Sequence, residues 1–166
     1  MAERSARLGL PMLAAGQAQK EWTHNEALAL LDMVAAGGVE SMGLDAPPPA
    51  PAEGRAWIVG SAPTRAWAGR ARHVAGWTGG GWRFVPPAEG MGLWVADVRM
   101  PARFEAGAWV PGELRAARVL VGGVPVLGAR EPAMAAPAGG ATVDAEARAA
   151  LGAVLAAMRA HGLIET

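Results

Sequence analysis

The stretch "TRAWAGRARHVAGWTGGGWRFVPPAEGMGLWVADV", residues 64–98, decides the fold. Short runs of β-branched and aromatic residues alternate in it with turns rich in glycine and proline. The same pattern starts at Arg55 and continues through "ARFEA", "AWV" and "ARVLVGGVPVL". It predicts an antiparallel β-meander domain over residues 55–132. Within it, "TGGG" at residues 78–81 predicts a hairpin turn and not a phosphate-binding loop, because a strand comes after it where such a loop needs a helix.

Tryptophan supplies most of the aromatic bulk of this region. Tyrosine is absent from the chain and phenylalanine occurs only twice. One interpretation is structural, since a half-buried indole adds a large apolar area to a thin sheet. The other is a sugar-binding face, because a flat exposed ring stacks on a pyranose. The candidates for stacking are the tryptophans expected in turns: Trp67, Trp77 and Trp109.

A first helix is predicted within "LPMLAAGQAQKEWTHNEALALLDMV", residues 10–34. Thr23 and Glu26 have the spacing of a capping box at its start, and Gly37-Gly38 ends it. The apolar face is expected to contain Ala27, Leu30, Leu31 and Val34. His24 and Glu26 are two residues apart and so point to different faces, which argues against a shared metal or an acid–base pair on this helix.

Polar residues precede this helix, and a proline-rich segment comes after it. Gln17, Gln19 and Lys20 offer hydrogen-bonding groups that suit either protein docking or an ordinary surface loop. The segment "DAPPPAPAEG" over residues 45–54 is typical of a stiff extended connector that holds the helix at a distance from the β domain. The expected organisation is a docking segment and helix over 1–44, the connector over 45–54, the β domain over 55–132, and a helical segment over 133–166.

The second helix is predicted between Ala141 and Ile164. Acidic residues lie in its first turn, and His161 with Gly162 marks its end. Gly152 in mid-helix suggests that another backbone approaches closely there. Four apolar residues repeat with four-three-four spacing, and one more widens the stripe; together they are Ala147, Leu151, Val154, Leu155 and Met158. This stripe packs either on the chain's own sheet or on other copies in an oligomer.

Composition excludes several classes of function. Fifteen basic and fifteen acidic residues cancel, so nucleic acid and anionic membrane surfaces are not expected partners. No apolar run is long enough to span a bilayer. Arg4 and Arg7 could form the n-region of a signal peptide, but the apolar run from Leu8 to Ala15 is broken by Gly9 and Pro11, which argues against one.

No enzymatic activity is expected. Cysteine is absent, no serine has the context of a nucleophile, and no cofactor or metal site is indicated. The sequence does not give the separations among Asp97, Glu105 and Glu113 that a glycosidase-like pair would need.

The blocks "LGLPMLAAGQAQKEWTHNEALALLD", "PPPAPAEGRAWIVG", "FEAGAWV" and "GGATVDAEARAALGAVLAAMRAHGLIET", together with the opening stretch, resemble a domain of unknown function. That domain occurs in alphaproteobacterial prophage fibre proteins and in gene transfer agent head-spike proteins. The resemblance covers nearly the whole chain, and the block "AAGQAQK" with "THNEAL" after it is its most specific part.

The resemblance implies a virion component, assembled in the host cytoplasm and released with the particle, that takes part in attachment to the host surface. The short chain suits a base or adaptor better than a complete fibre. Its expected partners are a capsid-vertex or spike-fibre protein and further copies of itself, in a pentamer or a trimer. The alternative is a glycan-binding module or tail-fibre domain that recognises host capsule polysaccharide. The expected fold is α+β and mainly β: a small Trp-rich antiparallel meander flanked by an N-terminal helix and a C-terminal amphipathic helix.

Overall fold

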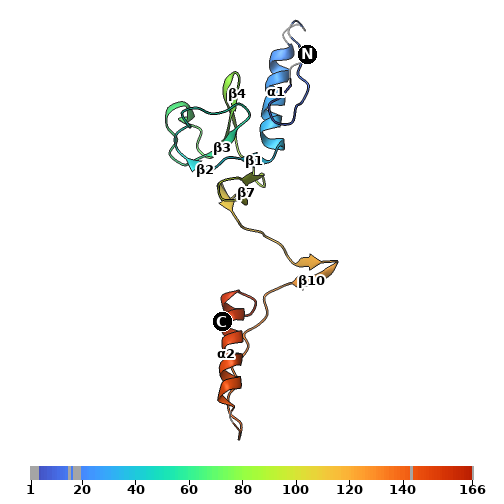
Figure 1. Cartoon of the computed structure of the whole chain (residues 1–166), viewed down its shortest axis with the longest axis vertical. Helices are drawn as coiled ribbons and strands as arrows, with labels where there is room; N and C mark the ends of the chain where they lie inside the picture. Colours follow the sequence, from blue (N-terminus) through green and yellow to red (C-terminus); the bar gives the residue numbers. More distant parts are fainter. Residues whose placement is uncertain (1–3, 15, 17–19, 143, 166) are drawn as a thin grey trace. The chain divides into compact units, whose positions relative to one another are not determined.

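The computed structural model describes residues 4–14, 16, 20–142 and 144–165. It divides the chain into two compact units, Met1–Glu113 and Leu114–Thr166. The described residues form short strands and two long helices (Figure 1), which confirms the predicted α+β, mainly β class. The elements of the first unit are α1 (Lys20–Ala35), β1 (Gly38–Val39), β2 (Met42–Leu44), β3 (Ala56–Val59), η1 (Arg65–Trp67), β4 (Val74–Thr78), β5 (Gly81–Val85), β6 (Gly92–Val95), β7 (Met100–Glu105) and β8 (Ala108–Pro111).

These strands form two four-stranded sheets of the same design. The orders are β1-β6-β7-β8 and β2-β3-β4-β5. In each sheet three strands form the predicted antiparallel meander, and a short strand pairs with the first of them in parallel. The hairpin predicted at residues 78–81 is present, with Thr78 opposite Gly81. The parallel pairs were not predicted, because β1 and β2 are too short to show an alternating pattern.

One apolar core joins both sheets to α1. It draws buried residues from α1, β1, β3, β4, β6, β7 and β8: Met33, Val39, Ala56, Ile58, Val74, Leu93, Val95, Ala102 and Trp109. The Trp109 indole N–H donates to the Arg72 carbonyl at 2.8 Å, so this tryptophan is satisfied as well as buried. The sheets and the helix are therefore a single packed body.

A tryptophan cluster covers the opposite face of β3-β4-β5. Alternate residues of β3 and β4 belong to the two clusters, as the two-residue period of a strand requires. Trp67 from η1 is fully buried against Trp57 and Trp82, with ring centroids 6.4 and 5.2 Å away. Trp77 packs on Trp82 at 5.1 Å. The structural interpretation of these tryptophans is thus confirmed, although the Trp67 indole N–H has no hydrogen-bond partner among the described residues.

The first helix differs from its prediction in start and in face. It begins at Lys20, so Thr23 lies inside the helix and is not its cap. Its buried residues are Asp32 and Met33, whereas Leu31 is 54% exposed. The predicted face was right in part: Leu30 packs against the core, but Ala27 and Leu31 are exposed. The prediction counted apolar residues alone, whereas the helix also turns a buried carboxylate towards the chain's own N-terminal segment.

The connector over residues 45–54 does not hold α1 away from the β domain. A Cβ placed on Gly76 of β4 would lie 2.5 Å from the Met33 Cε atom, so the methionine already fills the space above this glycine. The expected separation is therefore wrong: the helix lies directly on the sheet, and glycine at position 76 allows the approach.

The second unit contains β9 (Val119–Val121), β10 (Val124–Leu127) and α2 (Ala145–Ala160). The two strands form a hairpin through Gly122 and Gly123, both of which have positive φ as a tight primed turn requires. Neither strand belongs to the two larger sheets.

The helix α2 has the predicted signals at both ends. The Asp144 side chain caps its start by accepting from Ala147 N at 2.8 Å. At its end, Gly162 has φ +69° and Leu163 N donates to Met158 O, the pattern of a Schellman motif. A Cβ at Gly152 would meet no atom within 4 Å, so the expected close approach of another backbone is not found among the described residues.

The contact of Met33 with Gly76 predicts coupled stability changes. Met33→Ala opens a cavity and should cost about 2 to 5 kcal/mol, and Gly76→Ala overpacks the same place and should cost about 1 to 3 kcal/mol. In the double variant the added methyl group occupies the vacated space, so its cost should be smaller than the sum of the two by about 1 kcal/mol or more. Denaturant unfolding followed by tryptophan fluorescence measures all three; additive costs would contradict the contact.

Candidate functional site

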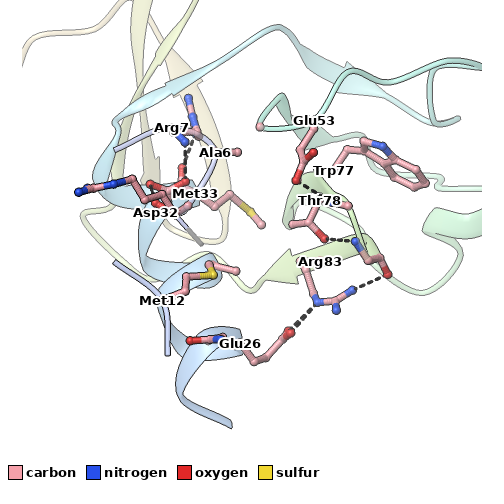
Figure 2. Close-up of a pocket in the computed structure, with 18 of the residues that line it drawn as sticks. Ala6, Arg7, Met12, Glu26, Asp32, Met33, Glu53, Trp77, Thr78 and Arg83 are labelled. Carbon is pink, nitrogen blue, oxygen red and sulfur yellow. Dashed lines mark hydrogen bonds and ion pairs between the residues drawn. The ribbon is translucent and has the colours of Figure 1, made fainter. Parts of the chain in front are cut away.

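A pocket of about 450 Å³ lies in the first unit, between the N-terminal segment, α1 and the β4–β5 hairpin. Figure 2 shows its two walls: Met12, Asp32 and Met33 on the side of α1, and Thr78 and Arg83 on the side of the sheet. The volume is in the range of ligand and side-chain binding pockets.

The Asp32 carboxylate holds the N-terminal segment against α1. Its Oδ1 atom accepts from Ser5 Oγ at 2.8 Å and from Leu8 N at 2.6 Å, and its Oδ2 atom accepts from Arg7 N at 2.9 Å. Asp32 and Ser5 are both buried. Three donors arranged around a buried carboxylate offset the cost of removing it from water.

The Arg7 side chain completes this junction. Its guanidinium donates to the Met33 carbonyl at 2.6 Å and to the Gly38 carbonyl. Burial lowers the pKa of Arg7, while the nearby charges of Asp32 and Glu40 act in the opposite direction. The carbonyls just before and after the end of α1 are thereby satisfied by a residue 26 or more positions earlier in the chain.

Asn25 and Glu26 connect α1 to two further segments that line the pocket. The Asn25 side chain accepts from Leu13 N at 2.9 Å and donates to Leu13 O at 3.0 Å, as a neighbouring strand would. Glu26 pairs with Arg83 Nε at 2.7 Å, which links α1 to β5. His24 itself is exposed. Asn25 and Glu26 therefore position chain segments against α1.

The pocket suits an apolar group better than a charged one. Its apolar lining includes Met12, Leu13, Ala29 and Met33, and Trp22, which is 77% exposed, also borders it. Methionine side chains adapt their shape, so the pocket can accept a partner's apolar side chain.

Most polar groups of the lining have partners within the chain, but the Glu21 Oε2 atom is buried without a hydrogen-bond partner among the described residues. Asp32 and Asn25 have their hydrogen-bond partners within the chain. The lining contains four arginines and four acidic residues: Arg4, Arg7, Arg55, Arg83, Glu21, Glu26, Asp32 and Glu53. The pocket therefore has no excess charge that would select an ionic ligand.

The three tryptophans proposed for glycan stacking are placed differently from one another. Trp67 is fully buried in η1, and Trp109 is buried in β8, so neither offers a ring face. The expectation that Trp77 and Trp109 lie in turns is wrong, since both are in strands. Trp77 keeps a partly exposed side chain, and Figure 2 shows its ring pointing away from α1.

The other predicted positions are not gathered at the pocket. Lys20 is exposed at the first position of α1, and Gln17 and Gln19 lie outside the described residues. Asp97 lies just after β6, and Glu105 ends β7 beside Arg103 at 3.2 Å. The described residues contain no group of three His, Cys, Asp or Glu side chains that could hold a metal. In the part of the chain that the structure describes, neither helix has the length and apolar character that a membrane span needs.

The junction around Asp32 is not predicted by the sequence. Arg7 suggests only a signal-peptide n-region, and no motif draws attention to Asp32. The available signal is the stripe Asn25, Ala29, Asp32 and Met33, which has helical spacing but mixes polar and apolar residues. In such a stripe the polar side chains can hydrogen-bond to the backbone of a neighbouring segment, as Asn25 and Asp32 do here.

Residues 24–110 match the model of a family described as a protein of unknown function, DUF2793. The chain belongs to this family. The match runs from α1 to β8, so the DUF2793 region lies within the first unit, and both the "AAGQAQK" block and the second unit lie outside it. No curated protein matches the chain.

The hydrogen bonds to Asp32 predict that removing its carboxylate lowers the stability of the first unit strongly. Asp32→Ala leaves the Ser5 hydroxyl and two backbone N–H groups without their acceptor, which should cost about 2 to 4 kcal/mol. Asp97→Ala is the matched control, because that carboxylate is exposed and accepts from its neighbour Val98 N; it should cost about 0.5 kcal/mol or less. Denaturant midpoints measure both, and equal midpoints would show that Asp32 is not a structural anchor.

Proposed function

We propose that this DUF2793 chain is a structural protein of a phage-like particle or gene transfer agent, acting as a head-spike base or adaptor in attachment to the host surface. The proposal is supported first by the blocks of resemblance to prophage fibre and head-spike proteins. In this proposal the protein works in the virion through contacts with other proteins and performs no catalysis.

The observation that carries the proposal is the uncovered apolar surface of the second unit. Of its described large hydrophobic residues, only Ile164 is buried. Ten are exposed: Leu114, Leu120, Val121, Val124, Val126, Leu127, Met134, Leu151, Val154 and Leu163. An isolated two-stranded hairpin is marginally stable in water, and so is a single 16-residue helix. A unit of this kind is suited to being completed by partners in an assembly.

The pocket of the first unit supports the same proposal. An exposed tryptophan beside an apolar cavity is the usual composition of a binding hot spot. Trp22 borders the pocket and lies two residues after Lys20, next to the segment proposed for docking. In the proposal a capsid-vertex or spike-fibre protein places an apolar side chain in this pocket and covers the Trp22 ring.

Particle binding tests the function directly. Empty particles that lack this chain should bind the purified protein with no added glycan, in a co-sedimentation assay. Trp22→Ala should weaken this binding about tenfold or more, because hot-spot tryptophans contribute about 2 kcal/mol or more. The matched control is Trp94→Ala, since Trp94 is 49% exposed on β6 and does not line the pocket. Particles that do not bind the chain at all would refute the proposal.

A second candidate, a glycan-binding module, is favoured by the surface of the tryptophan cluster. Trp77, Trp82 and Phe84 are partly exposed on one face of β4-β5. The Arg70 guanidinium lies 5.2 Å from the centroid of the Phe84 ring at this face. Rings beside a cation suit a sugar ring that carries an acidic substituent.

Substitution of Trp77 separates the two candidates. If the chain binds capsule polysaccharide itself, Trp77→Ala should abolish binding to the purified polysaccharide while the protein stays folded and Trp94→Ala binds normally. If the chain is an adaptor only, wild-type protein should bind particles and should not retain the polysaccharide. Isothermal titration with polysaccharide and co-sedimentation with particles supply the two measurements.

A further inference from the structure

The pocket of the first unit is lined by an acidic side chain with one unsatisfied oxygen. The Oε1 atom of Glu21 accepts from Gly16 N at 3.2 Å, whereas its Oε2 atom is buried and has no hydrogen-bond partner among the described residues. A buried carboxylate oxygen without a donor costs free energy, because it has lost its hydrogen bonds to water and gained none in exchange. A ligand that brings a hydrogen-bond donor into the pocket would remove this cost.

The Glu21 carboxylate can turn to meet such a donor. The last torsion of a glutamate side chain joins an sp³ carbon to an sp² carbon, and torsions of this kind have broad energy minima. The hydrogen bond from Gly16 N lies near the long end of the usual range, so it restrains the carboxylate only weakly. The Oε2 atom can therefore reach a donor in the pocket without a change in the backbone of α1.

The other acidic residues of the lining already have donors. Glu26 pairs with Arg83, and Glu53 accepts from a backbone N–H of the β4–β5 turn. Asp32 accepts three hydrogen bonds from the N-terminal segment. Glu21 is thus the acidic residue of the described lining that is available to a ligand. A cationic ligand gains no net attraction, because the lining contains as many arginines as acidic residues, and it must give up its water.

The apolar part of the lining favours an aromatic ring. Met12 and Met33 line the pocket, and methionine sulfur makes favourable contacts with aromatic rings. The Trp22 ring borders the pocket and is 77% exposed, so it can pack against a second ring. Tyrosine carries its O–H at the far end of the ring, so the O–H can meet a carboxylate while the ring stays among apolar side chains. An indole carries its N–H at the side of the ring.

We propose that the pocket binds a tyrosine side chain of a partner protein, with the ring against Met12 and Met33 and the O–H donating to the Oε2 atom of Glu21. This chain contains no tyrosine, so the tyrosine belongs to a different protein and not to another copy. The inference deepens the proposed function and rests on it, because it names the side chain by which a capsid-vertex or spike-fibre protein would engage the pocket.

Two small molecules test the recognition on the full chain. Para-cresol is the side chain of tyrosine, and para-methylanisole has the same ring with a methyl group in place of the O–H hydrogen. Each is titrated into the chain labelled with nitrogen-15, and the shifts of the amide NMR signals report both the site and the affinity. Para-cresol should shift the signals of Leu13, Ala29 and Thr78, which line the pocket. It should bind about tenfold or more tightly than para-methylanisole, because it donates to a charged group.

Three results of these titrations would overturn the inference. The first is equal affinity for the two molecules. The second is no shift of the pocket signals up to the solubility limit of para-cresol. The third is tighter binding of n-butylammonium, which imitates a lysine side chain, because it would show that the pocket selects a cation.

Substitution of Glu21 assigns the preference to its carboxylate. Glu21→Met removes both oxygens, keeps a side chain of similar length, and should make the affinities for para-cresol and para-methylanisole equal. Glu21→Gln changes the shape less and removes only the charge, so the preference should fall to about threefold. The matched control is Glu89→Met, since Glu89 is exposed and does not line the pocket; it should keep the full preference. The NMR spectra show whether each variant is folded, and an unchanged preference in both Glu21 variants would overturn the inference.

Binding to empty particles separates the inference from the function on which it rests. Glu21→Met should bind particles about tenfold more weakly than the wild-type chain, and Glu89→Met should bind them normally. If Glu21→Met also binds normally, the tyrosine contact is overturned and the adaptor function stands. If the wild-type chain prefers para-cresol but binds no particles, the recognition of a phenol group by the pocket stands and the adaptor function is refuted.

Discussion

The first unit depends on one buried carboxylate. Asp32 accepts hydrogen bonds from one hydroxyl and two backbone N–H groups of the N-terminal segment. The next residue, Met33, packs on Gly76 of the sheet. The same turn of α1 thus faces two partners through adjacent side chains. Arg7 then satisfies carbonyls on both sides of the helix end. Without this junction the pocket would lose one of its walls, because Met12 and Leu13 belong to the segment that Asp32 and Asn25 hold.

Much of the fold is determined by local signals in the sequence. The strands of the meanders, the turn at residues 78–81 and both ends of α2 were predicted, because each depends on residues close together in the chain. The parallel edge strands were not predicted, since a two- or three-residue strand has no period. The buried face of α1 was predicted only in part for a similar reason. Its partners, Ser5 and Gly76, lie 27 and 43 positions from Asp32 and Met33, the helix residues that contact them, and no local pattern indicates them.

The candidate site was predictable only in part. The tryptophans were identified as the main bulk of the β domain, but their individual burial depends on which face of β3-β4-β5 each one occupies. Trp67 and Trp109 proved to be core residues, whereas Trp77 remains partly exposed. For α2, the spacing identified the stripe, and the structure divided it: Leu155 belongs to the side covered by the chain's own residues 134–139, and Leu151 and Val154 to the open side.

The short run from β1 to β2 has a consequence for the order of folding. Residues 38–44 supply an edge strand to each of the two sheets, yet Gly38 pairs with Trp94 across more than fifty intervening residues, while Met42 pairs with Ile58 nearby. Closing the longer loop costs more chain entropy and requires the second meander to exist first. During synthesis both β1 and β2 are made early. We expect β2 to pair with β3 soon afterwards, whereas β1 can pair only once β6 has been made. During that interval the apolar face of β2-β3-β4-β5 has α1 as its partner but not yet the second sheet, so part of the core stays open until β6–β8 are made.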